Sequence, residues 1–218
     1  MKKFLALTVL FIFAMLAALA EIHVPRASAD TKLPEPQTSG GMGLFEALKK
    51  RQSAPGGDFP TAPLSDAELS NALWAATGLN RGETGWTVPM DRGLPPYVDV
   101  YAALPSGVFR YDWKAHSLAD VSKQDIRSKI GLQNFVASAP CSLIFVANAE
   151  SLAAIKNEEL RHQFADVAAG AMTQDVYLAA ASMGLGARYI HSIKEADIKR
   201  ELSLNDRDSV ICLMLLGK

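Results

Sequence analysis

Apolar positions spaced three and four residues apart mark the helices that this sequence predicts. The longest such stretch runs from Glu158 to Met183, is rich in alanine, and predicts a helix at the centre of the fold. A second helix starts at Ser65, whose side chain can accept from the Glu68 amide while the Glu68 side chain reaches back, and it ends at Gly78. Two further helices are predicted, at Leu44–Lys50 and Lys194–Leu202.

Short apolar runs bounded by turn residues predict the strands. Along Tyr97–Leu104 the apolar and polar positions alternate as in a strand. The turn Pro105-Ser106-Gly107 joins this strand to Val108–Asp112 as a hairpin. The stretch Gly82–Pro96 is rich in glycine and proline and predicts a loop with little regular structure. Three further strands are predicted, at Leu143–Ala147, Ala187–Ile190 and Ser209–Leu216. Helices mixed with hairpin strands, without repeated strand–helix units, indicate an α+β fold.

The first 29 residues form a separate segment by composition. Two lysines precede an uncharged apolar run from Phe4 to Ala20, and Ala27-Ser28-Ala29 offers a small-x-small cleavage site. We expect residues 1–29 to be a signal peptide, residues 30–42 an extended tether and residues 43–218 the folded domain. An uncleaved membrane anchor is the alternative, because the apolar run comes close to the ~17–25 residues that span a bilayer.

The charge balance of the chain excludes nucleic acid as an expected partner. Lysines and arginines number 22 and aspartates and glutamates 23, and no basic patch stands out along the sequence. A nucleic-acid partner would require such a patch to neutralise backbone phosphates, so we expect none. The histidines share no spacing typical of metal ligands, so no metal site is predicted either.

The two cysteines, Cys141 and Cys212, both lie in apolar, strand-like runs. This setting predicts that they are buried and behave as small hydrophobic side chains. A disulfide between them would require neighbouring strands with suitable Cβ geometry, which the sequence does not supply. A thiol redox protein that uses this pair is a weaker alternative for the function.

Several separate motifs follow one another in the order that one protein family shows. They are Leu73–Arg81, Asp125-Ile126-Arg127, Gln133–Val136, Ala139-Pro140 before an apolar strand, and Gly184-Leu185-Gly186 after the long helix. With these motifs the chain resembles the nitroreductase family from roughly Gly43 to Gly217. It is most similar to the branch of flavin-dependent dehydrogenases that includes the oxidases of thiazoline- and oxazoline-containing peptides.

This resemblance implies a nitroreductase-like fold, with a mostly antiparallel central sheet flanked by helices. It also implies a homodimer whose long helices pack across a two-fold axis, with flavin mononucleotide (FMN) at the subunit interface. Arg51, Gln52 and Ser53 match the family signature that contacts the FMN phosphate and ribityl chain, and a guanidinium fork beside a hydroxyl suits an oxyanion. His191 and Ser192 match the place where main-chain donors stabilise the reduced flavin ring near N5.

The sequence departs from the family pattern at two places. Family members usually carry a further basic residue two positions after the Arg-x-Ser signature, where this chain has Pro55. The second family motif is normally Pro-Ser-Ala or Pro-Ser-Ser followed by Asn and Gln. Here Pro89 is kept, Met90 replaces the serine, and Asp91 and Arg92 are the candidate polar substitutes. These changes motivate the alternative that the dimer holds no flavin.

The resemblance implies a periplasmic or otherwise exported oxidoreductase, which passes hydride or electrons through bound FMN to or from a small-molecule substrate. The flavin carries the chemistry in such a protein, so no side chain is required as a nucleophile. Nicotinamide cofactors are scarce outside the cytoplasm, so an electron donor other than NAD(P)H is equally admissible. The alternative is a flavin-less binding or scaffold protein, and membrane contact is expected only if the N-terminal segment stays uncleaved.

Overall fold

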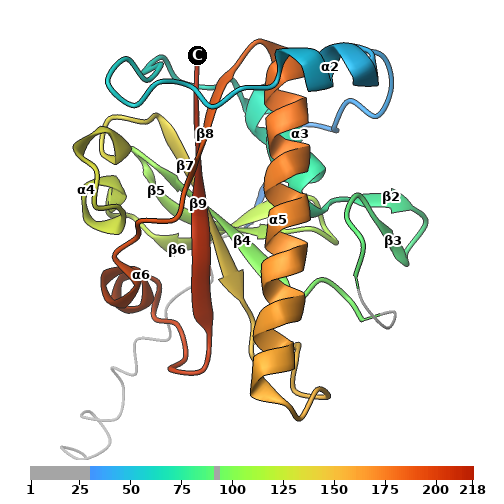
Figure 1. Cartoon of the computed structure of the whole chain (residues 1–218), viewed down its shortest axis with the longest axis vertical. Helices are drawn as coiled ribbons and strands as arrows, with labels where there is room; N and C mark the ends of the chain where they lie inside the picture. Colours follow the sequence, from blue (N-terminus) through green and yellow to red (C-terminus); the bar gives the residue numbers. More distant parts are fainter. Residues whose placement is uncertain (1–29, 91–93) are drawn as a thin grey trace, which may run out of the picture.

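A seven-stranded antiparallel sheet forms the centre of the protein, and helices cover both of its faces (Figure 1). The structure is a computed structural model that describes residues 30–90 and 94–218, so the predicted signal peptide and the loop residues Asp91 and Arg92 lie outside the described residues. The strands of the sheet are β1 (Thr31–Lys32), β4 (Val98–Leu104), β5 (Gly107–Asp112), β6 (Ser117–Ser122), β7 (Cys141–Ala147), β8 (Gly186–Ile190) and β9 (Ser209–Gly217).

The helices are α2 (Leu44–Lys50), α3 (Asp66–Thr77), α4 (Arg127–Ile130), α5 (Glu158–Met183) and α6 (Glu195–Leu202), with a short 3₁₀ helix η2 (Asn134–Val136). A separate hairpin pairs β2 (Leu79–Arg81) with β3 (Gly85–Trp86). The order of strands across the large sheet is β1-β6-β5-β4-β7-β9-β8, so β1 and β8 are its two edges. Every strand pairing in it is antiparallel.

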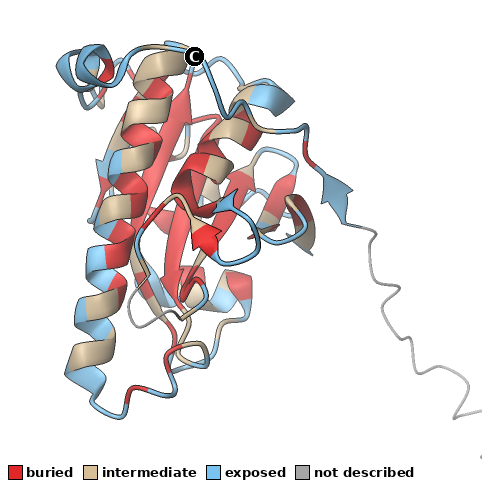
Figure 2. Cartoon of the chain, turned by 90° about the vertical axis from the view of Figure 1, so that its right-hand side faces the viewer, coloured by how far each residue is buried: buried red, intermediate tan, exposed pale blue. Residues whose placement is uncertain are grey.

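The central strands are buried on both faces of the sheet. All seven residues of β7 are buried, and successive side chains point to opposite faces. One face, which includes Phe145 and Met214, packs against α3 and α5, and the other, which includes Ile144 and Leu213, packs against α4 and α6. Figure 2 shows the buried strands between these layers. Strands covered on both faces are apolar at nearly every position, which explains their continuous hydrophobic pattern.

Most of the predicted elements are confirmed. The helix predicted from Glu158 to Met183 is α5 with the same bounds, and the capping box of Ser65 and Glu68 starts α3. The prediction of an α+β fold with an antiparallel sheet flanked by helices is also confirmed. Other elements were not predicted, namely β1, β2, β6, α4 and η2, and the predicted loop Gly82–Pro96 contains β3 of the small hairpin. No helix within the described ranges combines the length and apolar content needed to cross a membrane.

The segment predicted as an extended tether, residues 30–42, lies against the domain. Its strand β1 pairs with β6, and the side chain of Leu33 is buried in the core. The carbonyl oxygen of Pro34 accepts hydrogen bonds from the Ser70 hydroxyl at 2.6 Å and from His116 Nε2 at 2.9 Å. His116 has a positive φ of 50°, and its Nδ1 lies 2.8 Å from the Tyr111 hydroxyl. This cluster fixes the start of the described chain to one edge of the sheet.

The two cysteines are free and buried, as predicted. In the ladder between β7 and β9, Cys141 lies opposite Leu216 and Cys212 lies opposite Phe145, so the two thiols do not face each other. Burial raises the pKa of both thiols to about 12, which leaves them protonated at neutral pH. The thiol redox alternative therefore has no support from the structure.

The loop that follows α2 is held by the end of the sheet. Ala62 and Lys218 exchange two backbone hydrogen bonds of 3.0 Å, and the Ala54 amide donates to the Ala187 carbonyl at 2.8 Å. Gly217 lies directly under this loop, and a Cβ atom there would overlap the backbone of Pro60. The loop can approach β9 this closely because Gly217 has no side chain.

We predict that Gly217→Ala destabilises the protein by about 1–3 kcal/mol, because the added methyl group forces the loop away from the sheet. Urea denaturation measures this change as a lower midpoint. Gly57→Ala is the matched control, since nothing lies within 4 Å of a Cβ atom at that position. Equal stability of the two variants would contradict the assigned contact.

Candidate functional site

The edge strand β8 carries a set of outward-pointing backbone groups, and distant parts of the chain satisfy them. The Ala187 carbonyl accepts from the Ala54 amide at 2.8 Å. Two residues along, the Tyr189 amide donates to the Tyr177 hydroxyl oxygen at 2.8 Å. Backbone groups of alternate residues in a strand point to the same edge. The loop after α2 and the C-terminal part of α5 therefore meet at β8.

Tyr177 joins this strand to the residues predicted from the Arg-x-Ser signature. Its hydroxyl oxygen lies 2.7 Å from Ser53 Oγ. Because that oxygen already accepts from the Tyr189 amide, its own proton can be donated to Ser53. The Arg51 guanidinium lies 5.0 Å from the centre of the Tyr177 ring, within range of a cation–π interaction. The structure thus brings Arg51 and Ser53 to one place, with Ser53 exposed to solvent.

A hollow of about 360 Å³ lies beside this cluster, between the end of α2, the end of α5 and the start of β8. Gln52 lines it together with Tyr177, Asp58 and Gly184. The ammonium group of Lys50 also reaches this hollow but is paired with Glu46 at 2.8 Å. Asp58 in the lining opposes the binding of an anion in this hollow. The Arg51 guanidinium lies outside the lining, over the Tyr177 ring, and forms no ion pair among the described residues.

The two other predicted site residues, His191 and Ser192, are exposed and follow directly after β8. The rings of Tyr189 and His191 are stacked, with an interplanar angle of 5° and 6.5 Å between centroids. The Ser192 carbonyl accepts from the Leu132 amide at 3.0 Å, which fixes the turn after the strand. The His191 carbonyl accepts from the Ile193 amide at 2.9 Å, so the chain turns directly after β8. Tyr177 and Tyr189 connect the predicted residues.

The loop that carries Ser53 is supported from beneath by Arg188 of β8. The Arg188 guanidinium donates to the Ala54 carbonyl at 2.7 Å and lies 5.4 Å from the centre of the Phe135 ring. Its Nε is buried and has no hydrogen-bond partner among the described residues. The same Phe135 ring would block a Cβ atom at Gly56. These contacts give the loop a fixed position over the sheet edge.

Not all of the predicted polar positions reach this hollow. Met90, at the altered family motif, is partly buried and packs against the core, and no residue from Thr87 to Met90 lines the hollow. The ion pair of Asp125 with Arg127 is local, with a distance of 2.6 Å, and Arg127 also donates to the Ala139 carbonyl. The described residues contain no group of three or more potential metal-binding side chains of the His, Cys, Asp and Glu types.

Asp175, on α5 two residues before Tyr177, carries a carboxyl group with a raised pKa. Burial raises its pKa to about 6, because the charged form is poorly solvated there. It lines a hollow of about 260 Å³ with Trp74, Asn80 and Thr87. Its carboxyl group can therefore hold a proton close to neutral pH. Neither the helical pattern nor the family motifs indicated this residue.

Comparisons with known proteins agree on one family. The model described as "Nitroreductase family" matches residues 49–218. A protein of Methanocaldococcus jannaschii, provisionally named a nitroreductase, is 28% identical over 184 residues, which is 80% of this chain and 90% of that protein. A crystal structure from Ralstonia eutropha JMP134, also provisionally named a nitroreductase, is 38% identical, with a TM-score of 0.80 over 89% of this chain and 91% of the other.

A more distant structure shares the fold alone. The NADPH:FMN oxidoreductase of Vibrio harveyi, solved in complex with NAD⁺, is 22% identical to this chain. Its TM-score is 0.60 over 80% of this chain and 67% of the other.

We predict that Tyr177→Phe lowers the free energy of unfolding by about 1–2 kcal/mol, because it removes the hydroxyl shared by Ser53 and the Tyr189 amide. Urea denaturation measures the loss. Tyr189→Phe is the matched control: its hydroxyl has a 3.5 Å contact with His191 Nδ1 and a further contact with the weakly polar Cys212 thiol, so we expect less than about 0.5 kcal/mol. A Tyr177→Phe variant as stable as the control would contradict the bridging role.

Proposed function

Because this chain belongs to the nitroreductase family, we propose that it is an FMN-dependent oxidoreductase acting on a small-molecule substrate. Oxidoreductase activity and flavin use are typical of the family. The observation that carries the proposal is the continuous array at the edge of β8, in which Arg51 and Ser53 contact Tyr177, Tyr177 binds Tyr189, and Tyr189 stacks on His191.

The side chains of this array fit a phosphate-bearing flavin. Arg51 offers a guanidinium free of ion pairs among the described residues, and Ser53 offers an exposed hydroxyl already oriented by Tyr177. A guanidinium fork and a hydroxyl are suitable donors for a phosphate. Gln52 lines the adjacent hollow and adds an amide that can both donate and accept. These residues would hold the phosphate and ribityl end of FMN.

The other end of the array presents main-chain donors. His191 and Ser192 are exposed, and no acceptor within the described chain binds their backbone amides. When bound, FMN would supply the hydride and electron chemistry. The role of the chain would be to orient the ring and to donate to it through these amides, whose position the Ser192–Leu132 hydrogen bond fixes.

We further propose a homodimer formed through the outer face of α5. Val167 is 71% exposed on this face and Phe45 of α2 is 85% exposed, which is unusual for large apolar side chains. Gly170 lies on the same side of α5, with open space beyond it, so another helix could approach closely there. Figure 2 shows this outer side of α5 exposed along much of its length. A second copy of the chain would bury these groups.

The sequence of residues 1–29 supports an exported, periplasmic location, with cleavage after Ala29. The family motifs support the branch of flavin-dependent dehydrogenases that includes the azoline oxidases. An electron donor or acceptor other than NAD(P)H suits that location. The N-terminal residue of the protein purified from the exported fraction distinguishes cleavage from anchoring, because cleavage would leave Asp30 first.

A flavin-less scaffold is the second candidate, and two residues favour it. Pro55 occupies the place of a basic residue in the family signature, and the Asp58 carboxylate lines the hollow where an anion would be held. Both features weaken the binding of a phosphate. The two candidates predict different visible spectra for the purified protein.

We predict that the protein binds about one FMN per chain, and that Arg51→Ala with Ser53→Ala weakens this binding about 100-fold, because two phosphate donors are lost. Flavin absorbance after gel filtration and a fluorescence titration measure occupancy and affinity. Arg110→Gln is the control, since this exposed arginine lies on β5, outside the array. A colourless, folded protein that takes up no FMN at high concentration would support the scaffold instead.

We also predict that Val167→Arg converts the dimer to a monomer, because two guanidinium groups would be buried against each other at a two-fold interface. Sedimentation equilibrium measures the mass. Val121→Arg is the matched control, since Val121 is also a partly exposed valine but lies on β6. A wild-type protein that sediments as a single chain would contradict the proposed dimer.

A further inference from the structure

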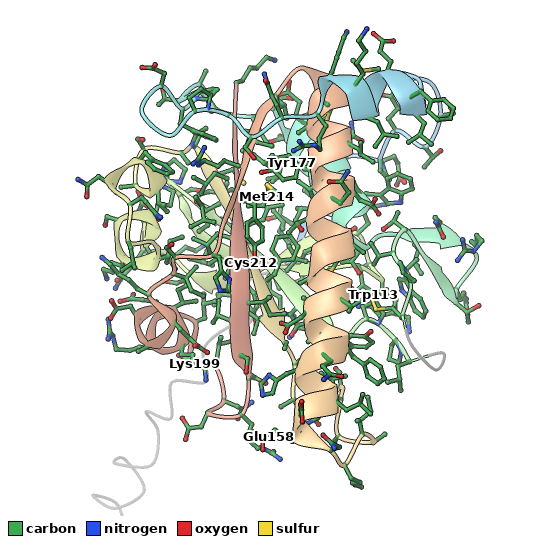
Figure 3. The ribbon with its side chains drawn as sticks, in the orientation of Figure 1. Trp113, Glu158, Tyr177, Lys199, Cys212 and Met214 are labelled. Atoms are coloured by element: carbon green, nitrogen blue, oxygen red, sulfur yellow. The ribbon has the colours of Figure 1, made fainter. Side chains whose placement is uncertain are left out.

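A second hollow lies at the other end of α5, away from the array at β8. Its volume is about 440 Å³. In Figure 3, Glu158 marks this end of the helix and Tyr177 lies close to the opposite end. At 1.5 Å per residue, the 26 residues of α5 span roughly 39 Å, so the two hollows are well separated. The family motifs of the sequence do not include this region.

Basic side chains dominate the lining of this hollow. Lys156, Arg161, His162 and Arg207 all contribute to it, and Glu158 is its one carboxylate. His162 Nε2 lies 4.0 Å from Glu158, so this pair is at the limit of an ion pair. Apart from His162, three permanent positive charges oppose one negative charge. The net charge of the lining is therefore about +2, which matches a dianion.

The cations of the hollow have few carboxylate partners. Arg207 is exposed and forms no hydrogen bond or ion pair among the described residues. Lys156 donates only to the Ala153 carbonyl at 3.2 Å, and Arg161 donates to the Ile155 carbonyl at 2.9 Å. Hydrogen bonds to backbone carbonyls orient these side chains but leave their charge uncompensated. A bound anion would therefore meet cations that no carboxylate already pairs.

Hydrogen bonds from backbone amides to two side chains hold the walls of the hollow. The carboxylate of Asp208, which is buried beside Arg207, accepts from the Ala149 amide at 2.9 Å and from the Asn205 amide at 3.1 Å. In the neighbouring segment, the side-chain oxygen of Asn148 accepts from the amides of Glu150 and Ser151 at 3.0 Å each. The loop with Arg207 and the segment that leads to Lys156 are thus fixed before any ligand arrives.

The hollow also has an apolar wall. Ala147, Ala149, Leu152 and Ala153 line it next to the basic side chains. Ala149 and Ala153 are its accessible part, because Ala147 and Leu152 are already buried. An inorganic ion would leave these two alanines in water, whereas an organic anion can cover them with an apolar body. The volume of this hollow lies in the lower part of the range that is typical of ligand pockets, so it can hold a small organic molecule.

We propose that this hollow binds a small organic phosphate monoester, with the phosphate between Arg207, Arg161 and Lys156 and the organic group against Ala149 and Ala153. The dianionic phosphate matches the net charge of the lining, and guanidinium groups suit its oxygens. This site is separate from the array at β8 and does not depend on flavin binding there.

The test is isothermal titration calorimetry with phenyl phosphate at constant ionic strength, in the full protein and in the Arg51→Ala variant. We expect saturable binding of one molecule per chain that persists in Arg51→Ala, because the array at β8 is not involved. Lys156→Gln combined with Arg207→Gln should weaken this binding at least about tenfold. Both side chains are exposed, so the variant should fold as the parent does.

Two controls make the result decisive. Arg110→Gln removes a charge from β5, outside the hollow, and should change the dissociation constant by less than about twofold. Benzoate, which carries one negative charge, should bind at least about tenfold more weakly than phenyl phosphate. The absence of saturable binding would overturn the proposal. Loss of binding in Arg51→Ala, or an equal loss in Arg110→Gln, would overturn it as well.

Discussion

The backbone groups on the open edge of β8 must find partners, and this requirement determines where the site forms. An unpaired amide or carbonyl beside a buried core is unfavourable, and an exposed strand edge can pair with other chains. In this protein the partners are the Ala54 amide and the Tyr177 hydroxyl, from the loop after α2 and from α5. The same two contacts place Arg51 and Ser53 beside the strand, so sheet integrity and site geometry depend on the same hydrogen bonds.

Much of the fold could be predicted because its signals are local. The capping box of Ser65 lies within four residues, and the pattern of α5 repeats over seven turns. The strand β6 was missed because its sequence, Ser-Leu-Ala-Asp-Val-Ser, contains only two large apolar residues and lies beside the edge strand β1. Its pairing with β5 and β1 stabilises it, and that pairing is a property of the tertiary structure.

The site was less predictable than the fold. Arg51, Ser53 and His191 could be selected because they match family motifs, but Tyr177 occupies an ordinary buried position of an apolar helix face. Its functional contact is with a residue 124 positions away, which periodicity does not reveal. Similarly, Arg161 lies near the start of α5, and it lines a hollow only because the loop with Arg207, distant in sequence, packs beside it.

The docking of the first described residues on β6 has a consequence for how the domain could be attached to a surface. The chain enters the sheet at β1, and six strand spacings of about 4.8 Å separate that edge from β8. A surface that held the protein through its N-terminal residues would therefore lie next to the β1 edge of the sheet, opposite β8. The edge with Tyr189 would stay roughly 30 Å away, open to diffusing molecules, whether the protein is released or remains attached.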